Sequence, residues 1–276
     1  MFKVLKNLKE SWISVIAIVL LLVVQAAGDL TLPDYTSKIV NVGIQNGGIE
    51  NVAPDVIRKS EMENLLIFTE DDDKILASYE EILKEDLDSE EYEKLVKKYP
   101  ALENEALYRI KKISKSEQDE LDSLMAKPLM MLSTTKQMPR EQIDKMLETV
   151  NQKLDDMQES ILEQAAIQEV KNEYKAIGID TDSIQNQYII MAGLKMLGIS
   201  LIIMISAISI MCLSARVAAK LAKTLREKVF KKVLSFSNKE FSEYSTASLI
   251  TRSTNDIQQI QGLIAILFRV VVYAPI

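Results

Sequence analysis

Residues 188–234 consist of the stretch YIIMAGLKMLGISLIIMISAISIMCL, followed directly by SARVAAKLAKTLREKVFKKVL. The first part is apolar apart from Lys195, whose aliphatic stem can carry its amine to a membrane surface. A helix rises 1.5 Å per residue and the hydrocarbon core of a bilayer is about 30 Å thick, so about 20 apolar residues cross it. The stretch therefore predicts a membrane helix.

The second part of this stretch carries an apolar stripe on a basic helix. Apolar residues recur every four positions, at Val217, Leu221, Leu225, Val229 and Val233. No Gly or Pro interrupts residues 199–234, so we expect one helix over 187–234, with about half of it projecting into the cytosol against other helices. A basic amphipathic helix lying on the membrane surface is the alternative.

A further membrane helix is predicted near the N-terminus, over residues 12–32, where the apolar run is ISVIAIVLLLVVQAAG. Lys3, Lys6 and Lys9 precede it. The other membrane helix is followed by a basic series, at Arg216, Lys220, Lys223, Arg226, Lys228, Lys231 and Lys232. Because basic residues flank membrane helices on the cytoplasmic side, the N-terminus and the segment after residue 213 are predicted to be cytoplasmic. A cleaved signal peptide is the alternative for the first helix.

The block between the two membrane helices is acidic and helical in pattern. Residues 29–187 carry a net charge of −16, against +2 for residues 1–28 and +7 for residues 188–276. Helix starts are predicted at Ser89 and Ser116, and Gly178 is placed to end a helix. We expect residues 46–186 to form a helical extracytoplasmic domain. Its charge excludes nucleic acid as a partner, since phosphate binding needs a basic surface.

Composition excludes several kinds of chemistry. The chain has no His, its one Cys is Cys212 in an apolar run, and it contains no GxxxxGKS/T phosphate-binding loop. We therefore predict no catalytic, cofactor-binding or metal site in this chain.

A loop with its own short helix is predicted after Leu234. Ser237, Asn238 and Ser242 are turn and cap residues. Ser245 or Thr246 can cap a short helix through Arg252. Asn255 and Asp256 would then start a helix whose apolar run, GLIAILFRVVVYAPI, is too short to cross a bilayer alone. Residues 257–276 are predicted to begin a third membrane helix.

This loop resembles the first intracellular loop of multidrug-type ABC exporters. The matching positions, in order, are Phe241, Ala247, Ser248, Leu249, Arg252, Asn255 and Asp256. Two further stretches, LPDYTSKIVNVGI at 32–44 and AAIQEVKNEYKAIGIDTDSIQNQY at 165–188, resemble a Firmicutes branch of half-transporters with a large insertion between membrane helices 1 and 2. The likeness covers 1–49 and 160–276.

The resemblance implies an all-α membrane protein, the N-terminal permease portion of an ABC half-transporter that exports amphiphilic compounds or drugs across the cell membrane. The family works as homo- or heterodimers, with ATP and Mg bound in nucleotide-binding domains that this chain does not contain. ATP hydrolysis is thus expected of the full-length protein alone. The expected coupling site comprises Phe241, Ser245, Thr246, Ala247, Ser248, Leu249, Ile250, Thr251 and Arg252.

The sequence thus predicts a cytoplasmic N-terminus and membrane helix 1 (1–45), an extracytoplasmic domain (46–186), membrane helix 2 with its cytosolic extension (187–234), an intracellular loop (235–256) and the start of membrane helix 3 (257–276). Two other classes share part of this plan. One is a membrane sensor or chemoreceptor-like protein with a helical extracytoplasmic ligand-binding domain, and the other is a membrane-anchored assembly or binding protein. Neither accounts for a third apolar helix.

Overall fold

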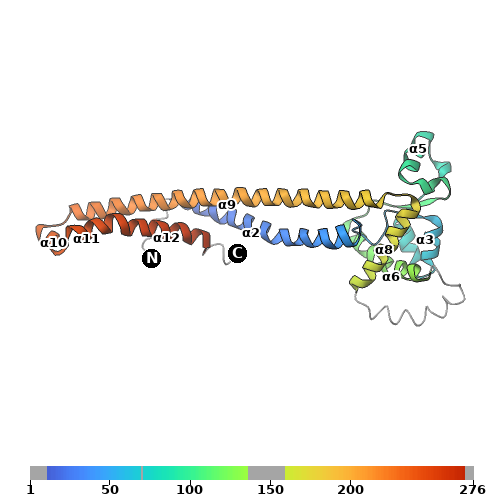
Figure 1. Cartoon of the computed structure of the whole chain (residues 1–276), viewed down its shortest axis with the longest axis horizontal. Helices are drawn as coiled ribbons and strands as arrows, with labels where there is room; N and C mark the ends of the chain where they lie inside the picture. Colours follow the sequence, from blue (N-terminus) through green and yellow to red (C-terminus); the bar gives the residue numbers. More distant parts are fainter. Residues whose placement is uncertain (1–10, 70, 136–158, 271–276) are drawn as a thin grey trace. The chain divides into compact units, whose positions relative to one another are not determined.

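The structure is a computed structural model that describes residues 11–69, 71–135 and 159–270. The chain divides into two compact units, and helices dominate both (Figure 1). Unit 1 takes residues 1–36 and 193–276, and unit 2 takes residues 37–192. The predicted all-α class is confirmed for the chain, which is mostly helical with few strands among the described residues.

Two long helices, α2 and α9, each run from one unit into the other, and the short helices of unit 1 follow them in the chain. The elements are α2 (Trp12–Lys38), α9 (Thr181–Leu234), α10 (Asn238–Glu243), α11 (Thr246–Thr251), the π-helix η5 (Arg252–Asp256) and α12 (Ile257–Val270). The predicted unbroken helix over 187–234 is confirmed, and it begins earlier, at Thr181. The predicted third apolar helix is described as far as Val270.

The core of unit 1 joins α2, α9 and α12. Its buried side chains are Ile18 and Leu22 of α2, Ile210, Val217, Ala218 and Leu221 of α9, and Ile264 of α12. The predicted apolar stripe on α9 is therefore buried at its first two positions, and Leu225 packs at the edge of the same cluster. A Cβ at Gly28 would lie 2.6 Å from the Ile203 side chain, so a glycine lets α2 and α9 approach this closely.

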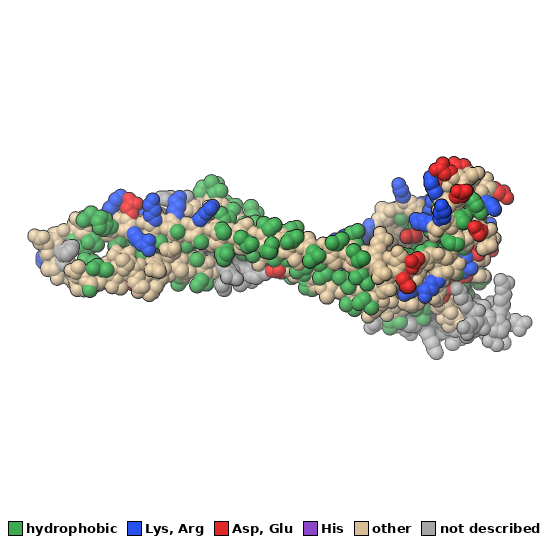
Figure 2. Space-filling model, turned by 45° about the horizontal axis from the view of Figure 1, so that its top comes forward, with side chains coloured by type: hydrophobic (Ala, Val, Ile, Leu, Met, Phe, Trp, Pro, Cys, Tyr) green, Lys and Arg blue, Asp and Glu red, His purple; other side chains and the backbone are tan. Residues whose placement is uncertain are grey.

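Large apolar side chains cover the outer surface of α9 in unit 1 (Figure 2). Those more than half exposed include Leu194, Leu197, Leu201, Ile205, Ile208 and Met211. Among the described residues, two helical stretches are long and apolar enough to cross a membrane, Trp12–Gln45 and Thr181–Leu234. An exposed apolar surface of this extent is unfavourable in water and favourable in lipid. The chain is an all-α membrane protein.

Unit 2 combines helices with a small sheet. After the π-helix η2 (Ile39–Gln45) it contains β1 (Val56–Arg58), α3 (Lys59–Leu66), α4 (Asp72–Ala77), β2 (Tyr79–Ile82), η3 (Lys84–Asp86), α5 (Ser89–Lys98), η4 (Pro100–Glu103), β3 (Leu107–Ile110), α6 (Lys115–Thr135) and α8 (Glu159–Ile177). The three strands are antiparallel in the order β1-β3-β2, with Tyr108 opposite both Ile57 and Glu81. The sequence did not predict this sheet.

The core of unit 2 lies between the sheet and a pair of helices. α6 and α8 pack on each other, and α8 also packs on β1. Ile57, Met62, Leu107, Met125 and Ile177 are fully buried there. Burial raises the pKa of the hydroxyl of Tyr79, which donates a hydrogen bond to the Pro54 carbonyl at 2.9 Å. This contiguous core gives unit 2 its own hydrophobic stabilisation.

Helix caps in unit 2 match the predicted helices, with two shifts in position. α5 begins at Ser89, but Asp88 is its N-cap and accepts from the Glu91 N–H at 2.8 Å. α6 begins at Lys115, one residue before the predicted Ser116, and Ser114 exchanges hydrogen bonds with Glu117. Gly178, at φ +92°, follows the last residue of α8 as predicted.

Candidate functional site in the loop after α9

The loop after α9 begins with a reciprocally capped helix. The Glu240 N–H donates to Ser237 Oγ at 3.3 Å, and the Ser237 N–H donates to Glu240 Oε2 at 2.8 Å. This capping box starts α10, and Ser237, which was predicted to be a turn or cap residue, is its N-cap. Hydrogen bonds from Ser237 lower the pKa of the Glu240 carboxyl. Phe241 falls in α10, and its side chain lies outside the described residues.

The predicted short helix is present as α11. Ser245 is its N-cap, and the Ser245 hydroxyl oxygen accepts a hydrogen bond from the Ser248 N–H at 3.2 Å. Of the two predicted cap residues, Ser245 is therefore the cap, and Thr246 is the first helical residue. The helix was predicted to run through Arg252, but α11 ends one residue earlier, at Thr251, and Arg252 is its C-cap. The structure thus brings seven of the predicted coupling residues into one helical turn and a half, at Ser245, Thr246, Ala247, Ser248, Leu249, Ile250 and Thr251.

The apolar residues of α11 differ in exposure. Ile250 is 57% exposed, whereas Leu249 is only half-buried. None of the residues of α11 is fully buried. Ile250 therefore presents the larger apolar surface, although both residues were predicted to supply contact.

The prediction that Asn255 and Asp256 start a separate helix is wrong. α11 continues without a break through the π-helix η5 into α12. The hydroxyls of Ser253 and Thr254 donate to the Ile250 carbonyl, at 2.9 and 2.7 Å. A π-helix is a widened stretch of helix and not a helix end, so the chain stays helical from α11 to α12. The sequence suggested a cap here because Asn and Asp are cap residues, but the backbone has no terminus to cap.

Two aromatic side chains, one after the end of α9 and one before the start of α11, stack on each other. The rings of Phe236 and Tyr244 are stacked with centroids 5.7 Å apart and an interplanar angle of 17°. The Nζ of Lys232 lies 5.9 Å from the Phe236 centroid, and the guanidinium carbon of Arg252 lies 5.6 Å from the Tyr244 centroid. An aromatic pair contributes about 0.5–1.5 kcal/mol beyond its buried area, and an exposed cation–π contact about 0.5–1 kcal/mol. Sequence reasoning missed this stack, although the aromatic and basic residues flanking the loop were visible.

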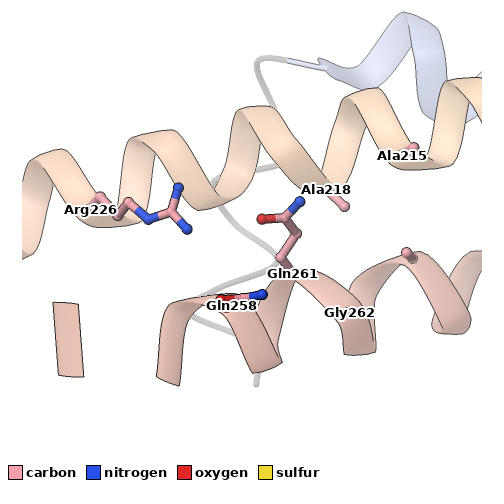
Figure 3. Close-up of a pocket in the computed structure, with 7 residues that line it drawn as sticks. Ala215, Ala218, Arg226, Gln258, Gln261 and Gly262 are labelled. Carbon is pink, nitrogen blue, oxygen red and sulfur yellow. The ribbon is translucent and has the colours of Figure 1, made fainter. Parts of the chain in front are cut away.

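A groove of about 520 Å³ lies between α9 and α12. Its lining comprises Ala215, Ala218, Arg226, Gln258, Gln261, Gly262 and Ala265. Figure 3 shows the Arg226 side chain of α9 extending toward Gln258 and Gln261 of α12. Small side chains line the part of the groove near Ala215, so its two ends differ in polarity.

Metal-ligating side chains do not gather at this site. Within the residues that the structure describes, no group of three or more His, Cys, Asp or Glu side chains could hold a metal ion. What the arrangement offers is a contact surface: a short, capped, exposed helix held between a long membrane helix and the start of another apolar helix.

Comparisons with known proteins point to one family. Residues 142–276 match the family model of the ABC transporter transmembrane region. Uncharacterized ABC transporter ATP-binding proteins of Mycobacterium tuberculosis and Mycobacterium bovis are 35% identical to this chain over 88 residues, which is 32% of this chain and 15% of each relative. The uncharacterized ABC transporter ATP-binding protein YfiB of Bacillus subtilis is 31% identical over 84 residues, which is 30% of this chain and 15% of the relative.

No solved structure matches the chain. The aligned part of the chain spans about 15% of the length of the curated relatives. The matched region holds α9 to α12, the helices that build the groove and the capped loop. Residues 142–276, which carry the second long apolar helix and the capped loop, are therefore similar to ABC transporter transmembrane regions.

Proposed function

We propose that this chain is the permease portion of an ATP-driven ABC exporter that moves amphiphilic small molecules out across the cell membrane. The observation that carries the proposal is α11, an exposed and capped helix within the region related to ABC transporter transmembrane regions. A membrane sensor would use the same region for its second membrane helix and signalling helix, so the family match favours the transporter over the receptor class.

Under this proposal α11 couples the membrane helices to a nucleotide-binding domain. A transporter has to carry force from a water-soluble ATPase to helices in lipid, and a helix extending beyond the bilayer can do so. Ile250 supplies an exposed apolar side chain for a groove on that domain, and Arg252 supplies an exposed charge. ATP and Mg would bind to the nucleotide-binding domain, and a second half-transporter would complete a homo- or heterodimer.

The proposed orientation follows from charge. We propose that the N-terminus and α10–α11 are cytoplasmic. The basic residues before α2 and along the second half of α9 support this orientation, because positively charged flanks stay on the cytoplasmic side. Residues 45–186 would then lie outside the cell membrane, as would their net negative charge. Under this proposal, this part corresponds to the large insertion between membrane helices 1 and 2 of the half-transporters that residues 32–44 and 165–188 resemble.

The test of coupling uses Ile250→Asp and Leu249→Asp in the whole transporter. Burying an unpaired carboxylate costs several kcal/mol, more than the roughly 1–3 kcal/mol that typically couples two sites. Both variants should insert into the membrane but lose export of an amphiphilic dye in reconstituted vesicles while ATP hydrolysis continues. Lys239→Ala, an exposed charge on α10, is the control and should behave as wild type. Normal export by both aspartate variants would contradict the proposal.

The test of orientation uses single cysteines in a Cys212→Ser background. Asp119→Cys, at an exposed position of α6, should react with a membrane-impermeant maleimide on intact cells. Lys239→Cys should react only after the cells are opened. Protection of the Asp119→Cys thiol on intact cells would show that unit 2 lies on the cytoplasmic side.

A further inference from the structure

The stacked rings of Phe236 and Tyr244 lie between the two ends of the loop. Phe236 comes two residues after the last residue of α9, and Tyr244 directly precedes Ser245, the N-cap of α11. Lys232, in the last turn of α9, lies over the Phe236 ring, and Arg252, at the C-terminal end of α11, lies over the Tyr244 ring. These three contacts link the four side chains into one group, which we name the loop stack.

The loop stack links elements that the backbone alone would leave loosely joined. α11 has six residues and none of them is fully buried. A helix of this length is unstable by itself in water, because the first turn costs more entropy than its few hydrogen bonds return. At its C-terminal end α11 is held by the continuous helix into η5 and α12. At its N-terminal end, the loop stack supplies the side-chain contacts to α9.

The order of the charges in the loop stack is consistent with this linking role. Lys232 and Arg252 carry like charges and would repel each other in direct contact. Each lies instead over a separate ring, where the ring's quadrupole attracts a cation. Tyr244 lies between Phe236 and Arg252, so its ring joins α11 to the end of α9. Removing that ring breaks both contacts at once.

We propose that Tyr244 is a positioning residue: through the loop stack it fixes the orientation of α11 relative to the end of α9. This inference rests on the proposed function, because the orientation matters if α11 couples to a nucleotide-binding domain. Movement of α9 then carries α11 with it, and loss of the Tyr244 ring lets α11 turn independently. Tyr244 itself does not touch the transported substrate or the nucleotide under this assignment.

The test measures the position of α11 and the coupling of transport separately, in the whole transporter. Spin labels at Lys223→Cys and Thr246→Cys, both exposed positions, report the distance between α9 and α11 in a Cys212→Ser background. Tyr244→Ala should broaden the distance distribution, whereas Tyr244→Phe, which keeps the ring, should restore the narrow distribution. Phe230→Ala removes another exposed aromatic side chain from α9, 63% exposed, and should leave the distribution unchanged.

The same variants are compared for transport per ATP hydrolysed in reconstituted vesicles. Tyr244→Ala should lower this ratio about two- to tenfold, the range that corresponds to the loss of an aromatic contact, and Tyr244→Phe should restore it. An unchanged distance distribution in Tyr244→Ala overturns the positioning role alone. A broadened distribution with an unchanged transport ratio overturns the role of the loop stack in coupling, whereas coupling by α11 itself is overturned only by normal export in Ile250→Asp and Leu249→Asp.

Discussion

The guanidinium of Arg58 donates two hydrogen bonds to the carboxylate of Glu173 in a bidentate arrangement, with Nε 3.0 Å from Oε1 and Nη2 2.7 Å from Oε2. Oε1 of Glu173 also accepts from the backbone N–H of Arg58, at 2.9 Å. The Glu173 side chain is only 2% exposed. Burying a carboxylate costs desolvation free energy, and the ion pair with Arg58 offsets that cost. The hydrogen bond to Glu173 raises the pKa of Arg58. The pair ties β1 to α8, 115 residues apart in the sequence.

Arg58→Ala should destabilise unit 2 by about 3–5 kcal/mol, because it leaves the buried Glu173 carboxylate without its cation. Urea unfolding of the fragment containing unit 2 measures this loss. The matched control is Lys94→Ala, which breaks an exposed pair with Glu90 and should change the free energy of unfolding by less than about 1 kcal/mol. Equal effects of the two substitutions would show that Arg58 contributes no more than a surface charge.

The fragment 45–186 should be soluble and predominantly helical when expressed alone. The described core of unit 2 includes side chains from α3, α6, α8 and the sheet, so its burial does not depend on membrane helices. Far-ultraviolet circular dichroism and size-exclusion chromatography measure the two properties. A spectrum dominated by strand, or an aggregated fragment, would contradict the prediction.

Gly48→Ala should destabilise unit 2. Gly48 has a φ of +83°, and a Cβ there would lie 2.8 Å from the Cα of Gln185 and 2.9 Å from the Ile184 carbonyl oxygen. A left-handed conformation costs a residue with a side chain about 1–2 kcal/mol, and the backbone atoms opposite cannot move aside as a flexible side chain could. Thermal unfolding of the intact chain in detergent measures the loss.

Gly193→Ala is the control for Gly48→Ala in the same protein. A Cβ at Gly193 would meet nothing within 4 Å, and Gly193 lies inside the helix α9. Because alanine favours a helix over glycine by about 0.5–1 kcal/mol, this change should be neutral or slightly stabilising. A loss of stability as large as that of Gly48→Ala would exclude backbone strain as the cause.

The cap of α6 should make unit 2 sensitive to acid. The carboxyl of Glu117 accepts from the backbone N–H of Ser114 at 2.6 Å, and hydrogen bonds from Ser114 lower its pKa from 4.5. A group with a lowered pKa in the folded state stabilises it above the unfolded-state pKa, and the contribution disappears as pH falls through the folded-state pKa. Carboxyl titration by NMR should therefore give Glu117 a pKa below 4.5 in the folded fragment.

Ser114→Ala should bring the Glu117 pKa part of the way back toward 4.5, since the hydroxyl is lost and the backbone N–H remains. In Glu117→Gln the acid-dependent loss of stability that belongs to this cap should vanish. A Glu117 pKa at or above 4.5 in the folded wild-type fragment would contradict the assignment.

The long helices and their ends were largely predictable from the sequence. The apolar run before Leu213 and the uninterrupted stripe after it predicted α9, and Ser245 and Gly178 marked helix ends correctly. Such features depend on residues within a few positions of one another, because a helix forms its hydrogen bonds four residues apart. Where adjacent residues could all cap, as at Asp88 and Ser89, pattern alone gave the helix but not its cap.

Contacts between residues distant in the sequence were decided by the tertiary structure. Each strand of the sheet has only three or four residues, too few for a clear alternating pattern. Val56 of β1 pairs with Arg109 of β3, although the elements from α3 to η4 lie between them in the sequence. The Arg58–Glu173 pair and the Phe236–Tyr244 stack likewise depend on how the chain folds back. The sequence by itself determined the membrane helices and the short capped helix, since local periodicity encodes them. Only packing in three dimensions decided which side chains hold those elements together.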